Sequence, residues 1–521
     1  MTGNAASEIA AGYATDGAAL ELGAVVVDQT ADASARVRIP FATLNRHGLV
    51  AGATGTGKTK TLQNLAEQCS AAGVPVLLAD VKGDLSGLAR AGETSDRTSK
   101  RAQETGDDWA PTAFPVRFLS LGAQGIGVPV RATITAFGPI LLSKVLGLNA
   151  TQESTLGLIF YWADQQGLAL LDTKDLRAVI QHLLSDEGKA ELKGIGGVSA
   201  ATAGVILRAL VNLEARGGDQ FFGEPEFDPK DLLAVEDGQG LVSLMELADQ
   251  QADPTLFSTF LMWLLAELFE ELPEAGDIDK PKLVFFFDEA HLLFADASKA
   301  FLDRIEQTVK LIRSKGVGVF FCTQLPTDIP NDVLSQLGAR VQHALRAFTP
   351  DDQKALTRTA RTYPKSTVYD IESALTSLGI GEAIVTVLSE RGAPTPVAWT
   401  RLRAPRSLMA AIGEPAVTEA AKASPLWPRY GETIDRESAY ERLSARTGAT
   451  AAPQTPPAEP VPEDQPPQAA PPQAPPPAED EGPGFVEKAM ANPVFKSFLR
   501  SAASAAGREI SRGLFGTARR R

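Results

Sequence analysis

A glycine-rich segment near residue 52 constrains the fold of this chain more than any other feature. Residues 52–59 read GATGTGKT and match the pattern G-x-x-x-x-G-K-[ST] at every fixed position. The apolar run 47–51 precedes this segment, and a stretch with helical character, residues 61–68, follows it. A strand, a glycine-rich turn and a helix in this order aim backbone N–H groups and a helix N-terminus at an anion. The segment therefore predicts a nucleoside triphosphate site in an α/β fold.

The residue types in this segment divide the work of holding a triphosphate. Lys58 is expected to neutralise the β- and γ-phosphates, and the hydroxyl of Thr59 is expected to bind Mg²⁺. The glycines let the backbone wrap tightly around the phosphates. The predicted cofactor-binding residues are consecutive: Gly52, Ala53, Thr54, Gly55, Thr56, Gly57, Lys58 and Thr59.

Two carboxylates follow a strongly apolar run later in the chain. Residues 283–287 read LVFFF, which is typical of a central parallel strand covered on both faces, and Asp288 and Glu289 come next. Open α/β sheets place their chemistry at the carboxyl ends of the strands. Asp288 is expected to bind the metal, and Glu289 to orient and polarise an attacking water. The alternative is that both residues only begin a helix, where the helix dipole favours negative charge.

A third apolar run, residues 316–322, ends in Thr323 and Gln324. The amide of Gln324 would contact the γ-phosphate and sense its loss if this strand lies beside the strand that ends at Asp288. The alternative is an ordinary residue that caps the loop after a strand. The residues alone leave both interpretations open.

Four segments together resemble the HerA/FtsK superfamily of P-loop ATPases. They are residues 45–48 (NRHG), 79–85 (ADVKGDL), 286–291 (FFDEAH) and 323–330 (TQLPTDIP). Within that superfamily the chain is similar to the bacterial HerA-like helicase family of the YjgR type, a former domain of unknown function. Residues 221–225 (FFGEP) resemble the same branch. The resemblance covers roughly residues 10–415 and implies a RecA-like ATPase core.

The resemblance also implies cofactors, catalytic roles and an assembly. ATP and Mg²⁺ are the implied cofactors, and no segment of the sequence reads adenine directly. Lys58, Glu289 and Gln324 take catalytic roles, and Asp80 would lie near the metal. The superfamily forms hexameric motors that move double-stranded DNA. Archaeal HerA proteins carry a β-barrel domain ahead of the core, for which the fifty or so residues before the loop leave no room.

Motors of this superfamily complete each site with an arginine from a neighbouring subunit. Arg313 best matches that position, and Arg340 and Arg346 are weaker matches. Such a residue stabilises the charge of the transition state. The alternative for Arg313 is a solvated helix end, where the dipole favours positive charge.

Two classes of function stay open. The first is a ring-forming ATP motor of the DNA translocase or helicase kind. The second is a nucleotide-switched assembly or regulatory ATPase that does not act on DNA. The net charge of −14 lacks the basic footprint of a protein that coats DNA, although a ring motor needs only basic pore loops. The basic run 97–101 is a candidate pore loop or a solvated surface.

The order of these patterns predicts seven segments along the chain. They are N-terminal strands (1–45), a first part of the ATPase core (46–136), a helical insertion (137–232), a second part of the core (233–410), a helical extension (411–447), a disordered Pro-rich linker (448–484) and a basic amphipathic helix (485–521). The last segment has eight basic and two acidic residues, a balance of +6. We expect it to dock on a neighbouring subunit, with nucleic acid and a membrane surface as alternatives.

Composition and patterning also indicate the compartment. The N-terminus lacks the positive-then-apolar pattern of a signal peptide. The apolar stretch 256–268 is too short to span a bilayer and contains Glu267, so no integral membrane segment is predicted. Cys69 and Cys322 lie in apolar surroundings and imply no disulfide framework or zinc site. A cytoplasmic protein is expected.

Overall fold

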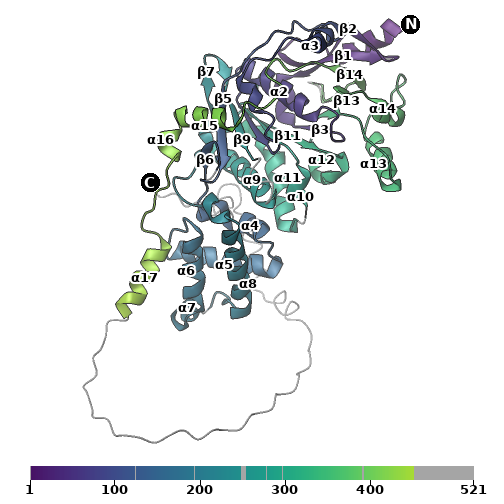
Figure 1. Ribbon diagram of the computed structural model, residues 1–521. Helices are drawn as coiled ribbons and strands as arrows, with labels where there is room; N and C mark the ends of the chain where they lie inside the picture. The colour runs from purple at the N-terminus through teal and green to yellow at the C-terminus, as the bar shows by residue number, and fades with distance from the viewer. Residues whose placement is uncertain are drawn as a thin grey trace, which may run out of the picture.

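The computed structural model describes residues 2–123, 125–192, 194–247, 254–276, 278–295, 297–389 and 392–450. The predicted amphipathic helix 485–521 lies outside the described residues, as does the predicted linker beyond residue 450. One large sheet organises the described chain, with helices packed around it and a group of helices beyond one end (Figure 1).

The sheet has twelve strands in the order β2-β1-β14-β13-β12-β3-β11-β10-β4-β9-β5-β6. Their bounds are β1 (Ala19–Val27), β2 (Thr30–Pro40), β3 (Gly48–Ala51), β4 (Val76–Asp80), β5 (Val116–Leu121), β6 (Val128–Val130), β9 (Val242–Glu246), β10 (Leu283–Phe287), β11 (Val317–Thr323), β12 (Ala339–Gln342), β13 (Glu382–Val387) and β14 (Ala398–Leu402). The strands from β12 to β6 pair in parallel, whereas β13, β14, β1 and β2 extend the sheet with antiparallel pairs. This arrangement confirms the predicted α/β fold with a parallel-sheet core. A two-stranded sheet, β7 (Val235–Glu236) and β8 (Gln239–Gly240), lies apart from it.

The helices fall into two groups. Those around the sheet are α1 (Thr2–Ala11), α2 (Lys58–Ala71), α3 (Asp96–Thr105), α9 (Pro254–Glu271), α10 (His291–Phe294), α11 (Lys299–Ile312), α12 (Asn331–Leu334), α13 (Pro350–Ala360), α14 (Ile371–Ser377), α15 (Glu414–Ala423) and α16 (Trp427–Tyr430). The second group gathers at the lower end of Figure 1: α4 (Ile134–Val145), α5 (Ala150–Gln165), α6 (Thr173–Leu184), α7 (Asp186–Glu191), α8 (Ala200–Ala215) and α17 (Ala439–Thr450). We call this second group, without α17, the helical subdomain.

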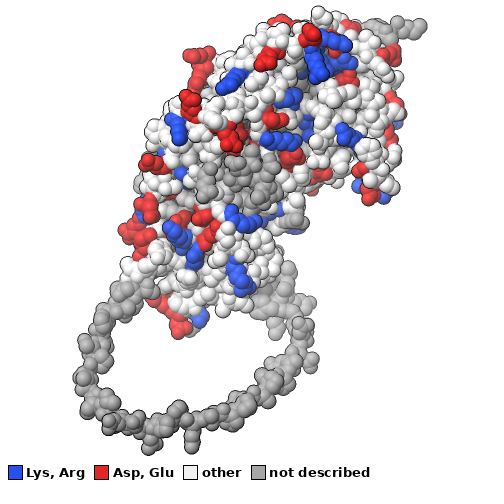
Figure 2. Space-filling view, in the orientation of Figure 1, with Lys and Arg blue, Asp and Glu red and all other residues white. Residues whose placement is uncertain are grey.

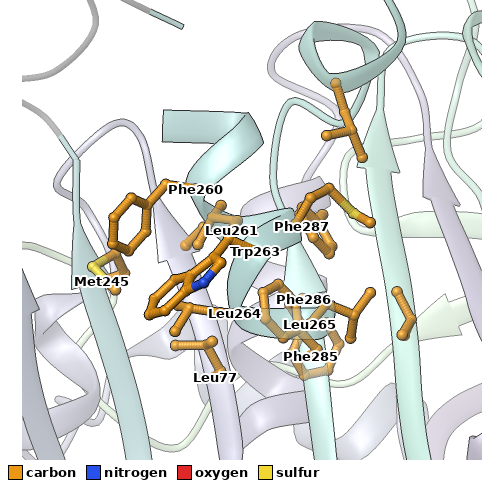
Figure 3. Packing of buried hydrophobic residues seen from close by; sticks show 14 of the residues in the cluster. Leu77, Met245, Phe260, Leu261, Trp263, Leu264, Leu265, Phe285, Phe286 and Phe287 are labelled. Carbon is orange, nitrogen blue, oxygen red and sulfur yellow. The ribbon is translucent and has the colours of Figure 1, made fainter. Parts of the chain in front are cut away.

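Helix α9 covers the central strands with an apolar surface (Figure 3). Its Trp263 and Leu264 lie against Leu77 of β4 and Met245 of β9, close to the three phenylalanines of β10, and all of these side chains are buried. Burying apolar area on both faces is what lets five consecutive residues of β10 be apolar without aggregation. Among the described residues, no helix combines the length and the apolarity needed to cross a lipid bilayer.

Residues 97–101, a candidate pore loop in the sequence, form part of helix α3 instead. Ser95 caps this helix, because its hydroxyl accepts a hydrogen bond from the N–H of Thr98 (3.2 Å) while the Thr98 hydroxyl accepts one from the N–H of Ser95 (2.9 Å). Gly106 ends the helix in the left-handed conformation. The guanidinium of Arg101 donates to the backbone oxygens of Gly381, just before β13, and of Leu402 in β14. The pore-loop interpretation is therefore wrong, whereas the alternative of a solvated surface agrees with the exposure of Arg97, Ser99 and Lys100 on this helix.

The chain after β14 returns along the sheet to the helical subdomain. The hydroxyl of Tyr430 donates to Asp231 (2.6 Å), and the buried carboxylate of Asp175 accepts from the hydroxyl of Ser438 (2.5 Å) and the N–H of Tyr440 (2.8 Å). Helix α17 packs against α6 (Figure 1). These contacts join a late segment of the chain to α6 of the helical subdomain and to the segment around Asp231.

Candidate functional site

The register of the central strands brings the three sequence motifs to one edge of the sheet. Ala51 of β3 pairs with Thr323 of β11, and Phe321 of β11 pairs with Phe287 of β10. The residues that follow these strands are Gly52, Gln324 and Asp288. Since the three strands are parallel, all three residues lie beyond the same carboxyl edge.

The loop of residues 52–59, hereafter the phosphate loop, has a backbone that requires glycine at its first position. Gly52 has a φ of +150°, and a Cβ atom there would lie 2.5 Å from the Cβ of His343. The N–H of Gly52 donates to the oxygen of Thr323 (3.2 Å), and the N–H of Ala53 donates to that of Ala344 (2.9 Å). Strands on both sides therefore fix the start of the loop, whereas Thr54 and Gly55 at its tip are exposed.

Lys58 begins helix α2 and is buried within the phosphate loop. Its ammonium donates to the oxygens of Gly52 (2.6 Å) and Ala53 (3.2 Å). Thr59 occupies the next position, in the first turn of the helix, and is partly exposed. The structure thus places a positive charge and a hydroxyl at a helix N-terminus, an arrangement that favours anions.

His343 packs against Gly52 of the phosphate loop and contacts helix α2, and no pattern in the sequence predicted this role. Its fully buried ring has Nε2 at 2.9 Å from the hydroxyl of Thr61 in helix α2. Burial, followed by the positive charge of Lys58, lowers the pKa of His343 to about 4. The imidazole is therefore neutral at neutral pH, which spares the loop a second buried positive charge.

Asp288 and Glu289 form the acidic part of the site. Asp288 is buried, and this burial, with a further contribution from Glu289, raises the pKa of its carboxyl group. The backbone of Glu289 adopts a φ of +49°, and its N–H donates to Oδ1 of Asp288 (2.9 Å). A positive φ at a residue other than glycine costs conformational energy, and such strain gathers at functional positions.

Lys82, which follows the neighbouring strand β4, contacts the acidic pair, and no pattern in the sequence predicted this contact. Its ammonium lies 3.4 Å from Oε1 of Glu289, while Nδ1 of His291 lies 3.4 Å from Oε2. Burial lowers the pKa of Lys82, but the carboxylates of Asp288 and Glu289 outweigh it and raise the pKa overall. Lys82 follows β4, which pairs with β10, so the contact depends on strand order.

Cys322 belongs to β11, the strand between the one that leads into the phosphate loop and the one that leads into the acidic pair. Burial, followed by the negative charge of Asp288, raises the pKa of the Cys322 thiol, while the charge of Lys58 opposes the shift. The thiol is therefore within electrostatic range of both Lys58 and Asp288. Cys322 is an inert buried residue in this setting, because a raised pKa keeps the sulfur protonated.

The residues at this edge fit Mg²⁺ bound with a phosphate ligand. Mg²⁺ keeps several waters and takes one or two protein oxygens together with substrate phosphates. A buried carboxylate at Asp288 and the hydroxyl of Thr59 supply oxygens of that kind. Among the described residues, no cluster of three or more His, Cys, Asp or Glu side chains would hold a metal by itself. The donor set therefore suits a metal that arrives with a nucleotide.

Two further sequence-predicted residues lie at the same edge. Gln324 is exposed directly after β11, while the preceding Thr323 is held by a hydrogen bond from its hydroxyl to Asp328 (2.8 Å). Asp80 ends β4, where its carboxylate accepts hydrogen bonds from the N–H groups of Gly83 (2.8 Å) and Leu85 (2.7 Å). Asp80 therefore shapes the turn that carries Lys82, and burial raises its pKa to about 6.

The three candidate arginines lie at three different places in the fold. Arg313 is exposed and precedes β11, so it lies at the edge of the sheet opposite to the phosphate loop of its own chain. Its charge adds to the burial that lowers the pKa of His47 to about 4. Arg340 donates to the oxygen of Thr362 (3.4 Å), and Arg346 is exposed in the segment after β12. No hydrogen bond or ion pair joins these three side chains to the phosphate loop, although Arg346 follows closely on Ala344, whose oxygen accepts from the N–H of Ala53.

Comparison with known proteins gives one family and one fold. The family model described as "Helicase HerA-like C-terminal" matches residues 26–521. The bacterial conjugative coupling protein TrwB, in an unbound monoclinic form, is 16% identical with a TM-score of 0.50, over 78% of this chain and 93% of that one. Its trigonal form with sulphate gives 16% identity and a TM-score of 0.50, over 78% and 94%.

VirB4 of Thermoanaerobacter pseudethanolicus is 14% identical with a TM-score of 0.47, over 75% of this chain and 98% of that one. At these identities the likeness to solved structures concerns the fold alone. No curated protein matches the chain in sequence.

Proposed function

Because the chain belongs to the helicase HerA-like C-terminal family, we propose that it hydrolyses ATP with Mg²⁺ and works as a ring-forming motor on double-stranded DNA. Six copies form the ring in this proposal. ATP as the nucleotide rests on the family membership.

One observation carries the proposal of hydrolysis. The phosphate loop, with Lys58, and the acidic pair Asp288 and Glu289 follow parallel strands of a single sheet edge, separated only by β11. Hydrolysis of a triphosphate requires a cradle for the phosphates, a carboxylate for the metal and a group that positions water. A protein that only bound nucleotide would need the first of these and not the third.

The residues divide the reaction between them. Lys58 and the N–H groups of the phosphate loop bind and neutralise the phosphates, and Thr59 with Asp288 would hold Mg²⁺, which would supply further charge neutralisation at the phosphates. Glu289 orients the attacking water and receives its proton. Gln324, at the end of the strand between them, contacts the terminal phosphate. Arg313 acts on the site of a neighbouring subunit, because its position excludes its own.

The second candidate is a nucleotide-switched assembly ATPase that ignores DNA. The acidic balance of the chain favours it, and Figure 2 shows acidic and basic side chains interspersed over the visible face. The helical subdomain and the C-terminal segment 485–521 would then be the surfaces that bind partners. In a ring motor, the same C-terminal segment docks on a neighbouring subunit.

Steady-state ATP hydrolysis with and without double-stranded DNA tests the proposal. The oligomer mass is measured on the same samples, and Lys58→Ala serves as the inactive control. A hexamer whose hydrolysis rises with DNA, and which loses activity in Lys58→Ala, is the expected result. Hydrolysis that is indifferent to DNA contradicts the motor and supports the switch. Absence of MgATP turnover in the wild-type protein, with or without DNA, contradicts both candidates.

A further inference from the structure

A short turn before β13 lies directly beside the phosphate loop. It consists of Gly379, Ile380 and Gly381. The N–H of Gly381 donates to the oxygen of Thr56 (3.1 Å), and a Cβ atom on Gly57 would lie 3.3 Å from the nitrogen of Gly381. The turn therefore contacts the loop at the point where helix α2 begins. When the phosphates of a ligand lie in the loop, the rest of the ligand extends past a segment beside the loop, and this turn is one such segment.

Hydrogen bonds from three directions hold the backbone of this turn. The guanidinium of Arg101 in α3 donates to the oxygens of Ile380 (3.3 Å) and Gly381 (2.9 Å). The N–H of Gly379 donates to Oε2 of Glu382 (2.9 Å), and the N–H of Leu402 donates to the oxygen of Gly381 (3.0 Å). The turn is thus a fixed structure, and a fixed neighbour of a binding loop offers a preorganised surface.

Ile380 points its side chain away from this framework, and its exposed fraction is 76%. A single exposed apolar residue is ordinary on a protein surface. Its position is what distinguishes Ile380, because the turn fixes an apolar group beside a loop whose other groups suit phosphates. A nucleotide has matching chemistry, since one end is a polyanion and the other is a flat, weakly polar aromatic ring.

We propose that Ile380 is the platform on which the purine base of a nucleotide lies while its phosphates occupy the loop of residues 52–59. This inference rests on the proposed function, because it requires the phosphate loop to bind a nucleotide. It extends that function to the part of the ligand for which the sequence has no motif.

The hydrogen bonds of the turn limit what the platform recognises. The oxygens of Ile380 and Gly381 and the N–H groups of Gly379 and Gly381 already have partners within the protein. The turn therefore offers the apolar side chain of Ile380 to a face of the base, while these four backbone groups are already engaged within the protein. Its contribution to affinity depends on the presence of a base, and not on the pattern of donors and acceptors that the base carries.

The test compares a ligand with a base to one without. Binding of MgADP and of inorganic tripolyphosphate to the full chain is measured by calorimetry for the wild type and Ile380→Ser. Ile380→Leu keeps an apolar platform, and Ile195→Ser changes an exposed isoleucine of the region between α7 and α8 as a control. Loss of the apolar contact should weaken MgADP by about tenfold in Ile380→Ser and leave tripolyphosphate within about twofold. Ile380→Leu and Ile195→Ser should match the wild type for both ligands.

Other outcomes overturn the inference. Equal weakening of MgADP and tripolyphosphate in Ile380→Ser would mean that the residue only supports the loop. Unchanged binding of both would mean that Ile380 meets something else, and a change in oligomer mass would then identify it as a subunit contact. A wild-type chain that binds MgADP no better than tripolyphosphate contradicts this inference alone, whereas one that binds neither contradicts the proposed function as well.

Discussion

The ammonium of Lys82 lies 3.4 Å from the carboxylate of Glu289, across the gap between the ends of strands β4 and β10. Glu289 holds a backbone conformation with a φ of +49°, which its side chain does not favour. The ammonium of Lys82, which follows the adjacent strand, fixes the direction in which the Glu289 carboxylate points. We therefore regard Lys82 as a positioning residue for the group that orients water.

Replacing Lys82 tests this role. Lys82→Ala should lower kcat for ATP hydrolysis by about tenfold, because the carboxylate loses its fixed orientation, while KM stays within about threefold since no phosphate contact is removed. Lys82→Arg should recover most of the rate. Lys354→Ala breaks a pair with Asp351 on the exposed surface of α13 and should behave as wild type. An unchanged kcat in Lys82→Ala would refute the positioning role.

The two acidic residues should separate into different phenotypes. Glu289→Gln keeps the size of the side chain but cannot accept a proton, so turnover should fall by about 10²- to 10⁴-fold while MgATP still binds. Asp288→Asn should instead weaken the Mg²⁺ dependence of nucleotide binding, because the metal loses a charged oxygen. Titration of Mg²⁺ at fixed nucleotide, followed by calorimetry, distinguishes the two. Identical behaviour of both variants would argue against separate metal and water roles.

His343 should make the stability of the protein depend on pH. Its pKa falls from 6.5 to about 4 on folding, so the unfolded chain binds the proton more readily. The contribution of His343 is complete above pH 6.5 and is lost as the pH falls toward 4. Asp80, whose pKa rises to about 6 from 3.8, acts with the opposite sign, because its protonated form is favoured in the folded chain.

A comparison of variants isolates the histidine from Asp80. Urea midpoints are measured for the wild type and for His343→Gln at two pH values. One lies above 6.5, and the other lies midway between the pKa values of His343 in the unfolded chain (6.5) and the folded chain (about 4). The wild type should lose more stability between the two conditions than the variant, because Asp80 and His47, whose pKa is also lowered to about 4, contribute equally to both. An equal loss in both proteins would show that His343 is not the titrating group.

Two glycines of the phosphate loop should differ in their tolerance of alanine. Gly55 has a φ of +80° but no atom within 4 Å of an added Cβ, so Gly55→Ala should cost about 1 kcal/mol from backbone strain alone. At Gly52 the added atom would lie 2.5 Å from the Cβ of His343. Gly52→Ala should therefore cost about 1–3 kcal/mol more than Gly55→Ala. Chemical denaturation measures both. Equal costs would mean that strand β12 moves aside freely.

The parts of the site that the sequence predicted are those encoded locally. Residues 52–59 and the pair at Asp288 follow apolar runs that had to be strands, and parallel strands bring such ends to one edge. The contact between Lys82 and Glu289 was not predictable in this way, because it requires β4 to lie beside β10 in the strand order. The role of His343 depends on β12 lying beside β3, which is equally non-local.

The wrong interpretation of residues 97–101 has a different origin. The helix signals were present in the sequence, since Ser95 stands three residues before Thr98 and Gly106 stands where a helix would end. The charge of the run suggested a pore loop, and only its alternative, a solvated surface, agrees with the exposed residues of α3. The hydrogen bonds of Arg101 could not be predicted from the sequence, because its guanidinium donates to the backbone oxygens of Gly381 and Leu402, which lie far along the chain.

Strand β14 pairs with β1 on one side and with β13 on the other. During synthesis, β1 and β2 leave the ribosome first, yet the neighbour that completes their side of the sheet is among the last strands to be made. Until then β1 and β13 each present an unpaired edge, the kind of surface through which nascent chains associate wrongly. We therefore expect a nascent chain of this protein to need protection until residue 402 has emerged, and we expect a polypeptide that ends before that point to aggregate.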